Sequence, residues 1–109
     1  MSYQVEISDN FKKEAKKLVK RYPSLHSEIA ELIEKLKENP RLGIHLGNDI
    51  YKIRIAIASK GRGKSGGARV MTYVEVSGTV ILLFSIYSKG EKDSLTDSEI
   101  EDLLKKHLD

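Results

Sequence analysis

The sequence has 109 residues and no cysteine, and its 19 basic and 16 acidic residues give a formal net charge of +3. This length predicts one domain, residues 1–109, and the lack of cysteine excludes disulfide frameworks, thiolate nucleophiles and cysteine metal sites. The N-terminus lacks a basic segment followed by an apolar one, and no apolar run approaches the roughly 18 residues that span a bilayer, so we expect a cytoplasmic protein with no membrane partner.

The first predicted elements are a strand and a helix. Tyr3–Ile7 alternates apolar and polar residues, which is the period of a half-buried strand. Ser8 and Asp9 are candidate N-caps for the helix that follows. Its apolar residues recur at helical spacing as far as Tyr22, and Pro23 then ends it.

A second helix follows at once. Ser24 can cap it, and its apolar face runs from Leu25 to Leu36 before the chain reaches Asn39 and Pro40, where the helix ends. Because the joint between the two helices is so short, we expect them to form an antiparallel hairpin.

The next segment returns the chain to a sheet. Residues 41–49 contain two glycines and no hydrophobic period, so they are expected to form a loop. Tyr51–Ala58 then alternates strictly, with isoleucines facing one way and Lys52 and Arg54 the other. This strand should bury its isoleucine face against the helices and present its basic side chains on the opposite face.

Two further strands, Ala68–Val76 and Thr79–Tyr87, are separated by the turn-forming pair Ser77-Gly78 and should form a hairpin. A two-residue turn would send Tyr87 to the sheet face opposite Arg69. A three-residue loop or a bulge would bring the two side chains level.

A final helix is predicted from Asp97 to about His107. Thr96 and Glu99 form a capping box, and apolar residues on either side of the cap supply a hydrophobic staple. The order β-α-α-β-β-β-α predicts an α+β fold, an antiparallel sheet covered on one face by the N-terminal helical hairpin, with a C-terminal helix added.

The positive charge is concentrated in the segment Ile50–Val74. It holds six basic residues and no acidic one, whereas outside it 13 basic residues face 16 acidic ones. A block of one sign attracts and steers a polyanion, so nucleic acid is the first partner to consider. The alternative is a solvated loop that is basic without binding anything. The six residues are Lys52, Arg54, Lys60, Arg62, Lys64 and Arg69.

Within this segment, residues 61–66 spell G-x-G-x-x-G, and Gly63-Lys64-Ser65 matches part of a Walker A loop. Both nucleotide-binding motifs need a helix directly after them, but here β-rich sequence follows, so both interpretations fail. What remains is a glycine-rich basic loop, Ser59–Gly67, that contacts phosphates; a flexible hairpin connection is the alternative. The residues expected to contact RNA are Lys60, Arg62, Lys64 and Ser65.

Three segments carry a resemblance to a known family: Tyr51-Lys52-Ile53-Arg54, GKSGGARV at 63–70, and LLFSIYSK at 82–89. They resemble the RelE/ParE superfamily of toxins from type II toxin–antitoxin modules, most closely its HigB-like branch, and the likeness covers nearly the whole chain. The resemblance implies a toxin that enters the ribosomal A site and cuts mRNA there. It also implies a cognate antitoxin that holds the toxin inactive, and through which alone it would reach operator DNA.

RNA cleavage without a metal or other cofactor uses the ribose 2′-OH as nucleophile, and needs a base, cations for the phosphorane charge and an acid. The resemblance carries Lys52, Arg54, Arg69 and Lys89 onto basic positions of the family site, and Tyr87 onto its strand-ending tyrosine. Arg54 and Arg69 would hold the phosphate, and Tyr87 would stack on a base or orient the ribose. Lys52 is the candidate base, since neighbouring cations favour its neutral form.

Several alternatives stay open. The basic residues could be solvated strand and loop residues, and the tyrosine a core aromatic. Some relatives use a histidine with a carboxylate; His45 is the one histidine here that could approach the site. A ParE-like toxin that binds DNA gyrase is disfavoured by the convergence of Lys52, Arg54 and Arg69, and a noncatalytic RNA- or ribosome-binding module by the scarcity of aromatic platforms.

Overall fold

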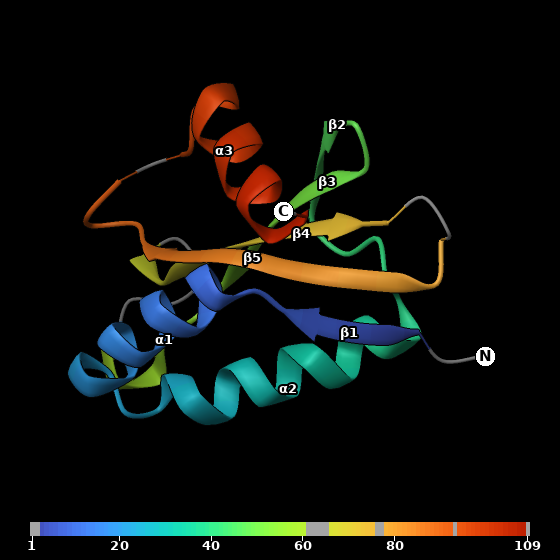
Figure 1. The fold of residues 1–109 in the computed structure, drawn as a ribbon. Coiled ribbons are helices and arrows are strands. Elements are labelled where there is room, and N and C mark those ends of the chain that lie inside the picture. Colours follow the sequence, from blue (N-terminus) through green and yellow to red (C-terminus); the bar gives the residue numbers. More distant parts are fainter. Residues whose placement is uncertain (1–2, 61–65, 76–77, 93, 109) are drawn as a thin grey trace.

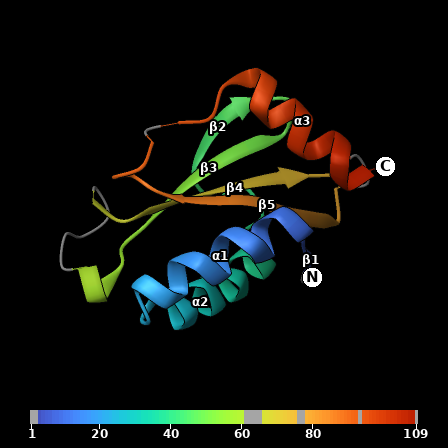
Figure 2. The same cartoon turned by 60° about the vertical axis from the view of Figure 1, so that its left-hand side comes forward.

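A five-stranded sheet forms the middle layer of the structure, with two helices on one face and one helix on the other (Figures 1 and 2). The computed structural model describes residues 3–60, 66–75, 78–92 and 94–108. The elements are β1 (Gln4–Ile7), α1 (Asp9–Arg21), α2 (Leu25–Glu38), β2 (Ile44–Gly47), β3 (Ile50–Ile55), the 3₁₀ turn η1 (Ala58–Lys60), β4 (Ala68–Val74), β5 (Val80–Ser88) and α3 (Asp97–Leu108).

The strands are ordered β1-β5-β4-β3-β2 across the sheet. Three neighbouring pairs are antiparallel, but β1 runs parallel to β5. The expected antiparallel sheet is therefore wrong at this edge, and the sheet is mixed. Alternation along a strand shows which side chains share a face, but it carries no information on the direction of a neighbour that is distant in sequence.

The α1–α2 hairpin covers one face of the sheet, as predicted (Figure 2). Alternating residues of the three central strands point toward it, so that the isoleucine face of β3 is buried while its basic residues lie on the other side. The buried residues on this face include Phe11, Leu18, Leu25, Leu32 and Leu36 from the helices, and Tyr51, Ile53, Val70, Ile81 and Leu83 from the strands.

The ends of the two helices follow the sequence signals in all but one case. The Ser8 hydroxyl accepts a hydrogen bond from the Phe11 amide at 3.1 Å and caps α1 as expected. Ser24 makes no such bond at the start of α2, because its own backbone is already helical and its side chain cannot turn back as an extended cap does. Its hydroxyl instead lies 2.8 Å from that of Ser59 and accepts the Ser59 amide at 2.9 Å.

The predicted loop at residues 41–49 was wrong in its middle, where β2 adds a short edge strand. Ile44 faces Lys52 and His45 faces Tyr51 in antiparallel register with β3. The strand has four residues and includes a glycine, which is too short for alternation to show in the sequence. Conversely, β3 stops at Ile55, before the expected Ala58.

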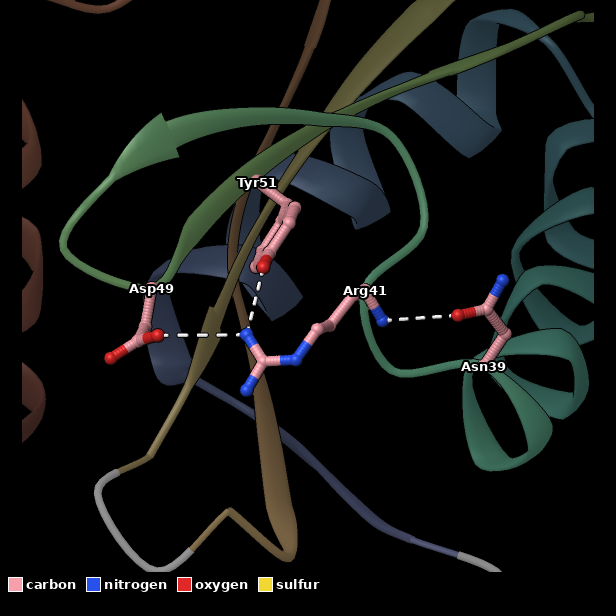
Figure 3. A network of polar contacts seen from close by, with 4 residues as sticks. All are labelled: Asn39, Arg41, Asp49 and Tyr51. Atoms are coloured by element: carbon pink, nitrogen blue, oxygen red, sulfur yellow. Dashed lines mark hydrogen bonds and ion pairs between the residues drawn. The ribbon is translucent and has the colours of Figure 1, made fainter.

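A polar network fastens this edge hairpin to the end of α2 (Figure 3). The Arg41 guanidinium donates to the Tyr51 hydroxyl at 2.8 Å and lies 3.6 Å from the Asp49 carboxylate, while its backbone amide donates to the Asn39 side chain at 3.3 Å. The bond to Tyr51, and then Asp49, raise the pKa of Arg41. The network stabilises a hairpin that has little core of its own.

The C-terminal helix begins as predicted. The Glu99 amide donates to the Thr96 hydroxyl at 3.1 Å, and the Thr96 amide donates to the Glu99 carboxylate at 2.9 Å. These bonds lower the pKa of Glu99. Leu95 and Ile100 are both buried against the second sheet face, together with Phe84. The capping box therefore starts α3 where its apolar side can dock on the sheet.

Candidate nucleic-acid interface

The helix α3 packs on the second sheet face over a buried cluster that includes Tyr87. On this same face, Arg54 faces Arg69 across the β3–β4 pair, and Arg69 faces Tyr87 across the β4–β5 pair. Directly facing residues have Cβ atoms about 5 Å apart and share one face of the sheet. The three side chains therefore form a row across three adjacent strands, which we call the Arg–Arg–Tyr row.

The members of the row differ in exposure. Arg54 is exposed, whereas Arg69 is 3% and Tyr87 2% exposed. The Arg69 guanidinium donates to the Ala68 carbonyl at 3.3 Å. Charged side chains are seldom this buried. The row thus presents one cation at the surface and holds a second, buried one beside it on the next strand.

Lys52 lies on the same face as the row. It precedes Arg54 by two residues on β3, about 7 Å along the strand, and it is half-buried opposite Met71. It therefore stands between the row and the part of the sheet that α3 covers. A substrate group bound at the two arginines would have this amine as its neighbour along the strand.

Lys89 is the first residue after β5 and is exposed. Its backbone amide donates to the Gly67 carbonyl at 3.1 Å, which brings it to the start of β4. A Cβ atom at Gly67 would collide with the Ile55 carbonyl oxygen, so only glycine fits where β3 and β4 come together. The close approach of the strands keeps Lys89 at the end of the sheet that carries the row.

The predicted phosphate-contacting loop starts beside α2 and ends at the beginning of β4. Lys60 closes η1, and its side chain, together with Arg62, Lys64 and Ser65, lies outside the described residues. The start of the loop is anchored to α2, since the Ala58 amide donates to the Glu28 carboxylate at 2.8 Å. Its last residue, Gly67, lies two positions before Arg69 of the row.

A bulge in β5 aligns the row. Near the turn Thr72 faces Leu83, the register that a two-residue turn dictates, whereas Met71 faces Ser85. Phe84 is therefore an additional residue on β5, and every later pair is shifted by one. Of the two arrangements the sequence left open for a level arginine and tyrosine, the structure shows the bulge.

The comparison with protein families decides the assignment. The family model described as "RelE toxin of RelE / RelB toxin-antitoxin system" matches residues 7–107. This chain belongs to the RelE toxin family. The narrower assignment to the HigB-like branch stays a prediction.

Solved RelE structures share the fold. A mutant of E. coli RelE in the free state aligns with a TM-score of 0.58 and 17% identity, covering 99% of this chain and 96% of that one. The isolated E. coli RelE toxin gives 0.60 and 18%, covering 96% and 99%. A mutant of E. coli RelE in complex with a RelB antitoxin peptide gives 0.60 and 20%, covering 94% and 93%. At these identities the likeness supports the fold alone.

His45, the one histidine expected to approach the site of this RelE-family chain, does not lie near it. His45 stacks on Tyr51, with ring centroids 4.9 Å apart and planes at 30°. Tyr51 belongs to the core beneath the α1–α2 hairpin, on the opposite sheet face from Lys52 and Arg54. The expectation that His45 could approach the site is wrong, because the unpredicted strand β2 fixes its direction.

Sequence reasoning missed one cation of this region. The Lys92 ammonium lies 5.8 Å from the centroid of the Tyr87 ring, within the range of a cation–π interaction. A turn brings it there, since the amides of Glu91 and Lys92 both donate to the Ser88 carbonyl, at 3.0 and 3.3 Å. Gly90 was the available signal, because a glycine directly after a strand indicates that the chain turns back.

Among residues 3–60, 66–75, 78–92 and 94–108, no three histidine or acidic side chains are grouped so that they could hold a metal ion. In the same residues, no helix combines the length and the apolar character needed to cross a membrane.

Proposed function

We propose that this chain is a toxin that cleaves mRNA on the ribosome, with residues 1–109 acting as one domain. The Arg–Arg–Tyr row across β3, β4 and β5 carries the proposal. In this reaction the ribose 2′-OH attacks its own 3′ phosphate, the bond to the 5′ oxygen breaks, and the products are a 2′,3′-cyclic phosphate and a 5′-OH. Negative charge builds on the phosphorane oxygens, and cations fixed in advance stabilise it.

Within this proposal, Arg54 and Arg69 bind the scissile phosphate, because a guanidinium can hold two phosphate oxygens at once. Lys52, when neutral, takes the proton of the 2′-OH, and Lys89, when protonated, gives one to the leaving 5′ oxygen. Tyr87 stacks on a base or orients the ribose. These roles are those that the family resemblance implies, and the position of each residue in or beside the row supports them.

The glycine-rich loop contributes affinity in this scheme. Lys60, Arg62, Lys64 and Ser65 contact the RNA backbone on either side of the scissile bond. Contacts of this kind carry little sequence information and weaken as salt rises. Neutralising them should therefore raise KM and reduce its salt dependence, while kcat changes less.

We also propose a cognate antitoxin as partner, since E. coli RelE has been solved with RelB in the intact complex and with a RelB peptide. An open apolar groove of about 500 Å³ runs between α1 and α2. Lys12, Lys16 and Lys20 border it, so it fits an amphipathic antitoxin helix with acidic residues beside its apolar face. Operator DNA would be reached through that antitoxin alone.

The test is to express the chain from a tightly controlled promoter and map mRNA 5′ ends on translating ribosomes. We expect cuts in phase with the codons. Changed DNA supercoiling with intact mRNA would instead indicate a gyrase-binding toxin, and ribosome binding without cuts a noncatalytic module. Arg69→Ala should abolish the cuts and the toxicity, whereas Lys13→Ala, which removes an exposed charge on α1, should retain both. Full toxicity of Arg69→Ala would overturn the site.

A further inference from the structure

The bulge in β5 is contacted from outside the sheet by the beginning of α1. The Ser8 amide donates to the Leu83 carbonyl at 3.0 Å, and the Asn10 side-chain amide donates to the Phe84 carbonyl, also at 3.0 Å. In a regular strand, consecutive carbonyls point to opposite edges. Here two consecutive carbonyls bond to the same partner element, which is the local distortion that the additional residue creates.

Glu14, one helical turn after Asn10, completes these contacts. One of its carboxylate oxygens, Oε1, accepts from the Ser85 hydroxyl at 2.8 Å, from the Ile86 amide at 3.3 Å and from the Asn10 side chain at 2.7 Å. Ser85 and Ile86 are each 1% exposed. A single carboxylate oxygen therefore ties both residues that follow the bulge to the side chain that holds the bulge itself.

These side chains take the place of a strand partner that β5 lacks along part of its outer edge. The strand β1 ends at Ile7, which pairs with Leu83, so β5 has no strand partner on its outer edge from Phe84 onward. A buried backbone group without a hydrogen bond is costly, and a strand edge with such groups favours another arrangement. Asn10 donates to the Phe84 carbonyl, as does the Ser8 hydroxyl at 3.4 Å, and Glu14 accepts from the Ile86 amide.

The competing arrangement is the sheet without the bulge. If the register set by the turn continued along β5, Arg69 would face Ile86, and Tyr87 would point to the face covered by α1 and α2. The Arg–Arg–Tyr row would then not exist. The bonds from α1 are made only in the bulged register, so they favour the arrangement that assembles the row.

We propose that Glu14 and Asn10 are positioning residues of the toxin: they hold the bulge at Phe84 and thereby keep Tyr87 opposite Arg69. Their effect on catalysis rests on the function proposed above, whereas their effect on the register does not. Neither residue is required to touch RNA, because both act through β5. This gives α1 a part in building the site on the opposite face of the sheet.

The test compares Glu14→Ala with Glu14→Gln. The glutamine keeps a carbonyl oxygen that can accept from Ser85 and Ile86, so it should rescue the alanine defect. Glu14→Ala should lower kcat for ribosome-bound mRNA by about 10- to 100-fold, as displaced catalytic groups do, with KM nearly unchanged. Lys13→Ala, next to it on the exposed side of α1, is the control.

A second readout does not depend on activity. In the wild-type protein and in Glu14→Gln, NMR should show cross-strand contacts between the backbone protons of Arg69 and Tyr87, and slow exchange of the Ile86 amide. In Glu14→Ala both signals should weaken. If they weaken while the wild-type protein cuts no mRNA, the positioning role stands and the proposed function fails. If Glu14→Ala keeps both the contacts and kcat, the positioning role is overturned.

Asn10→Ala provides an independent variant, which decides the question if Glu14→Ala does not fold. It removes the shorter of the two bonds to the Phe84 carbonyl, leaving the one from the Ser8 hydroxyl at 3.4 Å, and one of the three donors to Glu14. We expect a smaller loss of kcat than in Glu14→Ala and faster exchange at Ile86. Unchanged exchange and unchanged kcat in folded Asn10→Ala would contradict the proposal.

Discussion

The two faces of the sheet serve different purposes, although they are built from the same three strands. On one face, α1 and α2 cover a continuous layer of aliphatic and aromatic side chains. On the other, α3 covers a smaller cluster that includes Tyr87, and the Arg–Arg–Tyr row extends from this cluster to the exposed Arg54. Packing determines the first face, whereas the second face also carries the exposed cation that we propose binds substrate.

Ile53 and Arg54 show how narrow this division is. They are neighbours on β3, yet Ile53 is 7% exposed in the core beneath the helices and Arg54 is exposed on the other face. Because strand side chains alternate, one step along the chain passes from a core residue to a residue of the proposed site. A substitution at Ile53 should therefore lower the free energy of unfolding and leave the cleavage rate nearly unchanged. A substitution at Arg54 should lower the cleavage rate and leave the free energy of unfolding nearly unchanged.

The largest expected effect on stability comes from Ile53→Ala. Removing buried methyl groups and leaving a cavity should lower the free energy of unfolding by about 2 to 5 kcal/mol. Urea unfolding would measure this loss. The cleavage rate per folded molecule should stay close to that of the wild-type protein, since the row is on the other face; a rate that falls as far as that of a row variant would break the division between the faces.

Thr96→Ala tests how the capping box holds α3 on the second face of the sheet. It removes the hydroxyl that accepts the Glu99 amide and should lower the free energy of unfolding by about 1 kcal/mol. Ser98→Ala, an exposed serine in the same helical turn, is the control and should change stability less. Equal unfolding midpoints for Thr96→Ala and the wild-type protein would show that the capping box does not hold α3 on the sheet.

The smallest expected effect is at Glu75, which follows β4. Burial of its carboxylate, and then the neighbouring Glu6, raise the pKa of Glu75. A raised pKa in the folded state means that the protonated group stabilises the fold at low pH, and that this contribution is lost as pH rises through the raised value. Glu75→Gln should therefore be more stable than the wild-type protein at pH 7, by about 0.5 kcal/mol or less, the usual range at a surface.

The difference between Glu75→Gln and the wild-type protein should disappear below about pH 4, the ordinary range of a glutamate, because both side chains are then neutral. Thermal unfolding across this pH range measures it. Glu101→Gln, which replaces an exposed glutamate on α3, is the control. A Glu75→Gln variant that is less stable than the wild-type protein at pH 7 would contradict the assignment.

Much of the fold could be predicted because short local sequence patterns determine it. The cap at Ser8, the capping box of Thr96 and Glu99, and the alternation around Ile53 each act over a few residues, and the structure confirms them. The same alternation placed Lys52 and Arg54 on one face, away from the helices. Their catalytic roles stay proposals.

What the sequence did not predict depends on partners that are distant along the chain. The strand β2 exists because β3 pairs with it and Arg41 fastens it, and the parallel direction of β1 is set by β5. The bulge at Phe84 is held by Asn10 and Glu14, more than 70 positions away. The sequence showed that the row needed a bulge or a longer loop, but not which of the two the chain uses.

If the Arg–Arg–Tyr row is the site of RNA cleavage, its most direct test is the single-turnover cleavage rate of Arg54→Ala on mRNA-programmed ribosomes. Arg54 is exposed, so its loss should leave the unfolding midpoint unchanged. We predict a rate about 100-fold or more below that of the wild-type protein, the usual cost of removing one group that stabilises a transition-state charge, whereas Lys13→Ala should cleave normally. A folded Arg54→Ala protein that cleaves at the wild-type rate would contradict the claim.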